Sequence, residues 1–372
     1  MAEPKKNITV LVAMSGGVDS SVAAALLLEQ GYGVIGVTMK TYNFDEVGGN
    51  MENEASCCGL DAFNDARMVA VKLGIPHYVL DLTEQFGREV IDNFVGEYLH
   101  GRTPNPCIIC NKNIKWGELL KKADTLGAQY IATGHYARVR YDELRKRYSI
   151  LRPRDSLKDQ TYALWGLSQP ALSRTMFPLG ELTKPEVRKL AEVHGLKTAT
   201  KDESFEICFV PDNDYRRFLK DRVPGLQAET LEGDLMFDGH VVGKHHGISS
   251  YTIGQRSGLG SYGEKVYVTN IDAKANTITI GRKDDLFHNC LIAKDVNLIN
   301  VETLNGGLSV HAQVRYKDTP SPANVFVEPD GHIRIVFDQP KRAITPGQSV
   351  VFYDGDALVG GGVIERASRE TP

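Results

Sequence analysis

The sequence predicts an α/β domain with a parallel sheet, followed by a small mixed central domain and a C-terminal β-barrel. Up to about residue 210, short apolar runs alternate with helical segments, as in the βα units that build parallel sheets. Beyond that point helical periods become rare, and short alternating runs separated by turns predominate. The length of 372 residues fits two or three domains of roughly 100–200 residues each.

Strand and helix patterns alternate in the first half of the chain. The run Ile8–Met14 is apolar without alternation, which is typical of a strand buried on both faces. Ser20–Gln30 is rich in Ala and Leu and stops before a glycine, which predicts a helix. The same patterns predict strands at Val34–Met39, His77–Leu82 and Tyr130–Thr133, and helices at Asp61–Leu73, Glu84–Leu99 and Asn113–Leu126.

Short strands account for most of the second half. Pro329–Gly331 and Asp354–Gly355 separate pairs of alternating runs in the manner of hairpin turns. We therefore predict three domains, at residues 1–212, 213–286 and 287–372. The predicted strands are Val266–Ile271, Thr277–Gly281, Leu308–Tyr316, Asn324–Glu328, His332–Phe337, Ser349–Tyr353 and Ala357–Ile364.

Composition excludes several classes of protein. Hydrophobic residues make 42% and charged residues 24% of the chain, both ordinary for a soluble globular protein. No apolar run reaches the ~18 residues of a membrane span, and the first residues lack the pattern of a signal peptide. Six cysteines are too few for a secreted disulfide scaffold. We expect a cytoplasmic protein without membrane contact.

The charge distribution is uneven. The net charge is −4, yet residues 100–160 carry 13 Lys and Arg against 6 Asp and Glu. A basic segment in an acidic protein favours a localised site for a polyanion such as a nucleic acid. A solvated charged face explains the same excess equally well.

The segment Ser15–Ser21 lies between the first predicted strand and the first predicted helix. Its two adjacent glycines let the backbone approach an anion closely, and the helix points its free N–H groups at that anion. Its three serines add hydroxyl donors, and Asp19 either caps the helix or helps to hold Mg²⁺. The segment predicts a phosphate cradle at the C-terminal edge of the sheet. It is not a Walker A loop, because no G-x-x-x-x-G-K-[ST] string occurs.

Three cysteines lie in segments that are suited to thiol chemistry. Cys107 and Cys110 lie in the Pro-rich loop Gly101–Asn111, near the start of a predicted helix, where a positive helix end favours the thiolate. Cys208 lies in Ser204–Phe209, about a hundred residues further on. The adjacent Cys57–Cys58 pair is expected to be ordinary thiols, because a disulfide between neighbours is strained.

These motifs resemble known families. Ser15–Ser21 is similar to the pyrophosphate-binding loop of the adenine-nucleotide α-hydrolases, which cleave ATP between the α and β phosphates. With the cysteine segments, four further strings make the chain resemble the tRNA-specific 2-thiouridylase family from Ile8 to about Glu365. Those strings are Gly134–Arg138, Lys158–Tyr162, Thr345–Tyr353 and Gly360–Gly362.

The resemblance implies an enzyme that replaces the C2 oxygen of the wobble uridine of tRNA with sulfur. ATP adenylates the uridine O2, and the products are 2-thiouridine, AMP and pyrophosphate. Cys208 matches the cysteine that carries a persulfide delivered by a sulfur-relay protein or cysteine desulfurase. Cys110 matches its partner, assigned as the nucleophile, and a Cys110–Cys208 disulfide then forms and needs reduction.

The same match implies ligand-contacting residues, with ATP and Mg²⁺ as cofactors and the Lys, Glu and Gln tRNAs as substrates. The implied nucleotide contacts are Ala13, Met14, Ser15, Gly16, Gly17, Val18, Asp19, Ser20, Met39 and Gly134. The residues implied to face the target base are Asn105, Pro106 and Cys107. The implied tRNA contacts are His135, Lys158, Asp159, Gln160, Arg315, Tyr316 and Gln348.

Cys107 departs from the family pattern, in which Asp is often found and is a candidate acid or base. A thiol has a higher intrinsic pKa than a carboxyl group, so it does not simply inherit that role. Two interpretations therefore stay open. Sulfur is carried as a persulfide, or Cys107, Cys110 and Cys208 hold a [4Fe–4S] cluster whose fourth iron binds sulfide.

Two other functions are compatible with parts of the sequence. An ATP-dependent ligase that activates a small metabolite explains the phosphate loop, but it leaves Cys110, Cys208 and the basic segment without a role. A non-catalytic tRNA-binding or sulfur-carrier protein explains the basic segment. The complete Ser15–Ser21 string argues against a decayed loop of that kind.

Overall fold

The computed structural model describes residues 5–43, 60–200, 207–223, 225–226, 232–304 and 306–369. Cys57 and Cys58 lie outside these ranges. The chain divides into two compact units, and the domain boundaries expected at residues 212 and 286 stay predictions. Unit 1 consists of Met1–Val90, Cys107–Asp214 and Asp356–Leu358, and unit 2 of Ile91–Pro106, Tyr215–Gly355 and Val359–Pro372.

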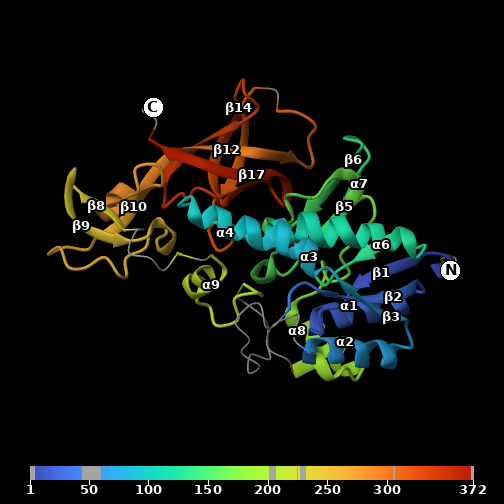
Figure 1. The fold of residues 1–372 in the computed structure, drawn as a ribbon. Coiled ribbons are helices and arrows are strands. Elements are labelled where there is room, and N and C mark those ends of the chain that lie inside the picture. The colour runs from blue at the N-terminus through green and yellow to red at the C-terminus, as the bar shows by residue number, and fades with distance from the viewer. Residues whose placement is uncertain are drawn as a thin grey trace. The chain divides into compact units, whose positions relative to one another are not determined.

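Unit 1 is built on a five-stranded sheet in the order β3-β2-β1-β4-β7 (Figure 1). All four strand pairs are parallel, with Leu11 of the central strand between Ile35 and Ile131. This confirms the predicted α/β class with a parallel sheet. The strands are β1 (Thr9–Ala13), β2 (Gly33–Lys40), β3 (His77–Asp81), β4 (Tyr130–Ala132) and β7 (Thr175–Met176).

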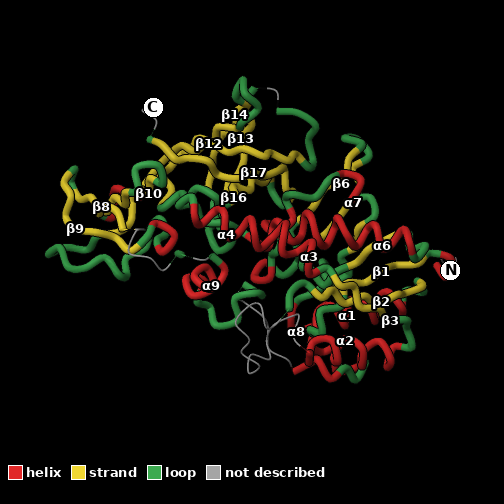
Figure 2. The backbone as a smooth tube through the Cα atoms, in the orientation of Figure 1, coloured by secondary structure: helices red, strands yellow, loops and turns green. Residues whose placement is uncertain are grey.

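Helices pack on the two faces of this sheet. Helix α1 (Val18–Glu29) lies on one face with α2 (Leu60–Leu73) and α8 (Lys184–Val193), and α6 (Leu119–Thr125) lies on the other (Figures 1 and 2). Shorter helices and a hairpin complete the unit, and the second hairpin strand pairs with Ala357 and Leu358 of β17. They are α3 (Thr83–Phe86), α5 (Pro106–Ile109), α7 (Gln169–Leu172), β5 (Arg138–Asp142) and β6 (Arg147–Leu151).

Two predicted helices differ from the observed ones. The helix expected over Glu84–Leu99 contains a π-helical segment, Gly87–Ile91, between α3 and α4 (Asp92–Leu99). The helix expected from Asn113 begins earlier, with α5 and a π-helix over Cys110–Glu118. Proline is well suited to the first helical position because its φ is already helical, so the chain turns helical at Pro106. Cys107 and Cys110 are therefore helical residues.

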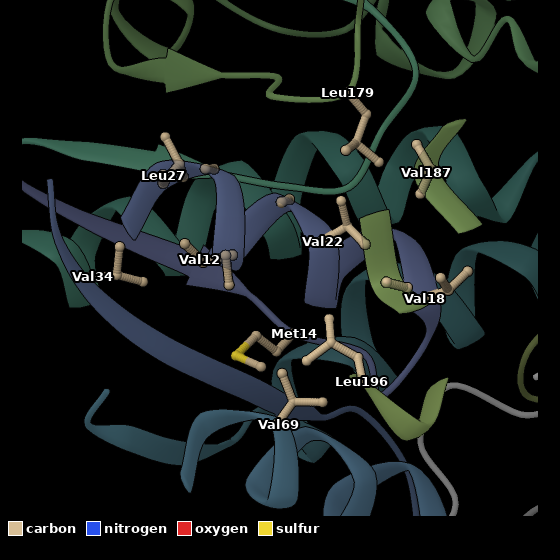
Figure 3. Packing of buried hydrophobic residues seen from close by; sticks show 14 of the residues in the cluster. Val12, Met14, Val18, Val22, Leu27, Val34, Val69, Leu179, Val187 and Leu196 are labelled. Carbon is tan, nitrogen blue, oxygen red and sulfur yellow. The ribbon is translucent and has the colours of Figure 1, made fainter. Parts of the chain in front are cut away.

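The core of unit 1 surrounds α1. Val12 and Met14 meet Val22 of α1, and Val69 of α2 and Val187 of α8 close the cluster (Figure 3). All five side chains are at most 4% exposed. Burying such a side chain contributes about 1.5–3 kcal/mol, so the cluster holds α1 firmly on the sheet. Because α2 and α8 flank it, α1 is apolar nearly all round.

Unit 2 contains a four-stranded sheet in the order β10-β11-β8-β9 and a barrel. Its six barrel strands follow the order β12-β15-β14-β13-β16-β17, and β12 also pairs with β17 to close the ring. The predicted C-terminal β-barrel is thereby confirmed. The strands are β8 (Glu232–Phe237), β9 (His240–His246), β10 (Tyr267–Asp272), β11 (Thr277–Gly281), β12 (Phe287–Leu298), β13 (Leu308–Gln313), β14 (Ser321–Val327), β15 (Ile333–Arg342), β16 (Ser349–Asp354) and β17 (Ala357–Ser368).

Two helices belong to unit 2 through aromatic contacts. In α4, Tyr98 stacks on Tyr215 of α9 (Tyr215–Arg222) at 4.6 Å between ring centroids. Phe94 meets Phe218 edge to face at 6.0 Å.

Across the described ranges, the helices all fall short of the length and apolarity that a bilayer crossing requires.

We predict that Gly134→Ala destabilises unit 1. A Cβ at this position would lie 2.7 Å from Ser20 N and 2.8 Å from Asp19 C, which are backbone atoms that cannot swing away. We expect a loss of about 1–3 kcal/mol in the free energy of unfolding, as for other overpacked sites. Urea unfolding followed by tryptophan fluorescence measures it, because both tryptophans, Trp116 and Trp165, belong to unit 1.

Gly87→Ala is the matched control. Gly87 is helical, at φ −55° and ψ −57°, and apart from its chain neighbours and its own helix backbone no described heavy atom lies within 4 Å of an added Cβ. Alanine is expected there to leave stability unchanged or to raise it by up to about 1 kcal/mol. Equal stabilities of the two variants would contradict the close packing inferred at Gly134.

Candidate functional site

The turn from β1 into α1 forms a tight loop at the C-terminal edge of the sheet. Ser20 braces it, since the Ser15 N–H donates to Ser20 Oγ at 3.1 Å and the two hydroxyls are 3.3 Å apart. Gly16 has φ +71°, and a Cβ there would lie 2.3 Å from the Ala62 carbonyl oxygen, so only glycine fits. Gly17 is the N-cap and has no capping side chain. The first N–H groups of α1 are thus available to an anion.

The predicted nucleotide residues gather at this edge. Ala13 ends β1, Met39 is the second-last residue of β2, and Gly134 follows β4. These strands are neighbours in the sheet, and Gly134 packs directly on the first turn of α1. Ligands of open α/β sheets bind outside the carboxyl ends of the strands. The structure therefore assembles the predicted residues into one location, while their individual contacts with ATP stay predictions.

Asp19 forms an ion pair with a lysine and does not cap the helix. Lys184 Nζ lies 2.7 and 2.8 Å from its two carboxylate oxygens, and the Tyr136 hydroxyl donates to Oδ1 at 2.9 Å. The expectation of a helix cap is wrong, because Gly17 is the N-cap. Both oxygens of Asp19 accept a hydrogen bond from the lysine, which leaves the suggested magnesium-ligand role without structural support.

Sequence reasoning missed Lys184. Its position is set by helix α8, which begins at this residue with a capping box between Thr183 and Glu186 and a proline in the first turn. Thr-x-x-Glu with an adjacent proline is a helix-start signature that could have predicted α8. The pairing with Asp19, 165 residues away, has no local signal.

The two predicted sulfur-handling cysteines are anchored on the same helical segment. Cys110 begins a π-helix that packs against α3, and Asn113 of that helix donates to Glu89 at 3.0 Å. The Cys208 carbonyl accepts from the Tyr42 hydroxyl at 2.6 Å. The next residue, Phe209, is buried and packs edge to face on Phe86 of α3.

The environments of the three thiols differ. Cys107 is exposed, whereas Cys110 and Cys208 are half-buried. Within the described ranges, no three Cys, His, Asp or Glu side chains are placed to hold a metal ion. The three thiols do not form such a group there, so this geometry gives the [4Fe–4S] interpretation no support.

His135 is half-buried, and its imidazole ring packs among aromatic rings. Its ring lies 5.7 Å from Trp116 and 6.3 Å from Phe177, and Nδ1 is 2.8 Å from the Thr133 hydroxyl. Burial lowers the pKa of His135 well below its ordinary value, and the charge of Lys115 adds to the effect. If His135 contacts RNA as predicted, it does so by hydrogen bonding and not as a cation.

Two of the three residues predicted to contact tRNA at positions 158–160 make hydrogen bonds within unit 1. Asp159 pairs with Arg152 and accepts from Thr161 N and Oγ1 at 2.9 and 2.6 Å. Gln160 Oε1 accepts from the Tyr136 N–H at 2.8 Å. This segment is thus joined to the strand end that carries His135. Lys158 is partly exposed.

In unit 2, Gln348 supports the predicted base-facing loop. Its amide donates to the carbonyls of Thr103 and Pro104 at 3.1 and 3.0 Å, just before Asn105 and Pro106. The Thr103 N–H donates to the Pro346 carbonyl at 2.9 Å.

The two other predicted tRNA contacts of unit 2 differ in exposure. Arg315 is engaged by the backbone, since it donates to the carbonyls of Arg342 and Ala343 at 2.7 and 3.2 Å. Tyr316 is 45% exposed.

Comparison with known proteins covers almost the whole chain. Three family profiles match, described as a tRNA methyl transferase HUP domain (residues 8–212), a tRNA methyl transferase PRC-barrel domain (216–282) and an aminomethyltransferase beta-barrel domain (288–364). The tRNA-specific 2-thiouridylase MnmA of Salinibacter ruber is 52% identical over 95% of this chain and 94% of its own. That of Pelotomaculum thermopropionicum is 53% identical over 96% and 97%.

One solved structure among the matches is a 4-thiouridine synthetase–RNA complex with bound ATP. It is 19% identical, covers 59% of this chain and 51% of its own, and has a TM-score of 0.37. A likeness of this size supports no conclusion about activity.

Fold and family models together define a HUP-domain protein with a tight glycine loop between β1 and α1, extended by a PRC-barrel and a second β-barrel. Relatives that are 52% and 53% identical over almost the whole chain identify the family within this class. The chain belongs to the tRNA-specific 2-thiouridylase family.

We predict that His135 makes stability fall at acid pH. Because its pKa is lower in the folded protein, the unfolded chain binds the proton first. The contribution of His135 to the free energy of unfolding is fully present above pH ~6.5, and it is lost as the pH falls towards the pKa of His135 in the folded protein. Between pH 7 and 5, the free energy of unfolding of His135→Gln should therefore fall less steeply than that of the wild type. The difference between the two slopes corresponds to at most one bound proton. Urea unfolding at each pH measures this slope, and parallel curves for variant and wild type would contradict a neutral His135.

Proposed function

We propose that this protein is an ATP-dependent tRNA-uridine 2-sulfurtransferase that thiolates the wobble uridine. The main support is that one compact unit holds the anion-binding loop together with Cys110 and Cys208, both anchored on the segment that begins with α3. Relatives of about half identity along the whole chain carry the name tRNA-specific 2-thiouridylase. A ligase for small metabolites is not favoured, because it would leave both thiols without a role.

The proposed reaction has two stages. Uridine O2 attacks the α-phosphorus of ATP, and the bond to the β-phosphate breaks to release pyrophosphate. The terminal sulfur of a Cys208 persulfide then adds to C2. The Cys110 thiolate attacks Cys208 Sγ, the S–S bond gives its electron pair to the sulfur on C2, and AMP leaves with O2. A thiol reductant supplied from outside reduces the resulting Cys110–Cys208 disulfide.

The parts of unit 1 have distinct tasks in this scheme. The N–H groups at the start of α1 would receive the phosphates. Since Asp19 is engaged by Lys184, we assign Mg²⁺ to the phosphates of ATP and water, a coordination that this ion commonly keeps. No step passes through an iron–sulfur cluster.

Recognition of tRNA is proposed to combine unspecific and base-directed contacts. The basic excess over residues 100–160 suits the phosphate backbone. Lys158 and Tyr316 offer partly exposed side chains, and Asn105, Pro106 and Cys107 are proposed to face a base turned out of its stack. The Lys, Glu and Gln tRNAs, a sulfur-relay protein or cysteine desulfurase as donor, and a cytoplasmic location belong to the same proposal.

The test is nucleoside mass spectrometry of unmodified wobble-uridine tRNA after anaerobic incubation with protein, ATP, Mg²⁺ and a persulfide source. Wild-type protein should form 2-thiouridine. Cys110→Ser and Cys208→Ser should lower the rate at least about a thousandfold, as expected when a reacting sulfur is lost. Cys290→Ala, at a buried barrel position, controls for the loss of a cysteine as such.

Parallel arms with iron reconstituted or removed distinguish the sulfur carriers. Equal activity in both arms, with activity retained in Cys107→Ser, is expected for the persulfide route. Activity only with iron, and none in Cys107→Ser, would refute it. Absence of 2-thiouridine in every arm, with the sulfur donor shown to be competent, would refute the function.

A further inference from the structure

The ion pair between Lys184 and Asp19 joins the start of α8 to the start of α1. Lys184 is the first residue of α8, its side chain is 9% exposed, and its Nζ reaches both carboxylate oxygens of Asp19. Asp19 is the second residue of α1, directly behind the anion-binding loop. The pair thus lies at the end of the helix that is proposed to receive phosphates.

Lysine is unusual at such a position. Lys is rarely buried, and a positive charge at a helix N-terminus is disfavoured by the helix dipole. The surrounding contacts nevertheless hold it in place. The Lys184 N–H donates to Asp155 at 2.9 Å, and Glu186 accepts from the Thr183 N–H at 2.7 Å and from Arg154 at 2.7 Å. The start of α8 is therefore positioned independently of the ion pair.

Asp19 is enclosed from a second direction. The Tyr136 hydroxyl donates to Oδ1 at 2.9 Å, and Lys184 Nζ lies 5.9 Å from the centroid of the same ring. A Cβ on Gly134 would lie 3.0 Å from Asp19 Cβ. The carboxylate is thus directed at Lys184 and Tyr136, and its charge is offset at short range.

The charge balance bears on phosphate binding. A carboxylate in the first turn of α1 would, on its own, repel the polyphosphate that the helix N-terminus attracts. A cation fixed on both carboxylate oxygens removes that repulsion and leaves the N–H groups of the loop to act on the anion. We infer that Lys184 is a positioning and charge-compensating residue for the nucleotide site, which makes the acidic start of α1 compatible with ATP. This inference rests on the proposed use of ATP.

The test is a comparison of ATP dissociation constants, measured by calorimetry with Mg²⁺ and without tRNA. Lys184→Met should weaken ATP binding at least tenfold, because Asp19 keeps its charge. Asp19→Asn added to Lys184→Met should recover most of the lost affinity, because neither charge is then present. Lys184→Arg should bind more tightly than Lys184→Met. Lys189→Met, an exposed position on the same helix, should match wild type.

Each outcome decides the inference. Wild-type affinity in Lys184→Met would overturn it. A double variant as weak as Lys184→Met would also overturn it, because the lysine would then act on the phosphates directly. If Lys184→Met does not fold, as judged by circular dichroism, Lys184→Gln takes its place with the same expectations. The thiouridine assay on wild-type protein tests the proposed function separately, so failure of the function and failure of the inference are distinguishable.

Discussion

The contact of backbone against backbone around the start of α1 is the constraint on which unit 1 depends. Gly16 lies against the backbone of α2, and Gly134 lies against the backbone of Asp19 and Ser20. Neither position has room for a Cβ, so the loop takes its shape from main-chain atoms that cannot change rotamer. A phosphate site made of main-chain N–H groups needs such rigidity, because its donors are useful only when they already point at the anion.

The same unit fixes the two thiols by different means. Cys110 belongs to a π-helix tied to the segment after α3 through Asn113 and Glu89, whereas Cys208 belongs to an irregular segment held by its carbonyl and by Phe209. The Cys110 thiol thus projects from a helix, whereas Cys208 lies outside helix and strand. The two thiols that are proposed to exchange sulfur therefore come from different kinds of backbone, both anchored on the segment that begins with α3.

Local pattern was sufficient to predict much of this architecture. Unbroken apolar runs identified the buried strands, the glycine pair identified a tight turn between β1 and α1, and alternating runs identified the barrel. Three features could not be predicted in this way. The Lys184–Asp19 pair and the amide of Gln348 on the loop at Thr103 join residues more than 160 positions apart. The π-helical segment at Cys110 keeps the hydrophobic spacing of an ordinary helix closely enough to be taken for one.

Gln348 also changes how the barrel is understood. By resemblance it is a tRNA contact, yet its amide nitrogen serves the two carbonyls that precede Asn105. A Cβ on the neighbouring Gly347 would lie 2.8 Å from Thr103 O, so the barrel and this loop meet without spare room. Asn105 and Pro106, two of the three residues expected to face the target base, thus follow directly on carbonyls that the barrel holds, and the chain enters unit 1 at the third, Cys107. A change in Gln348 therefore acts on the base-facing loop first, and any effect on RNA follows from that.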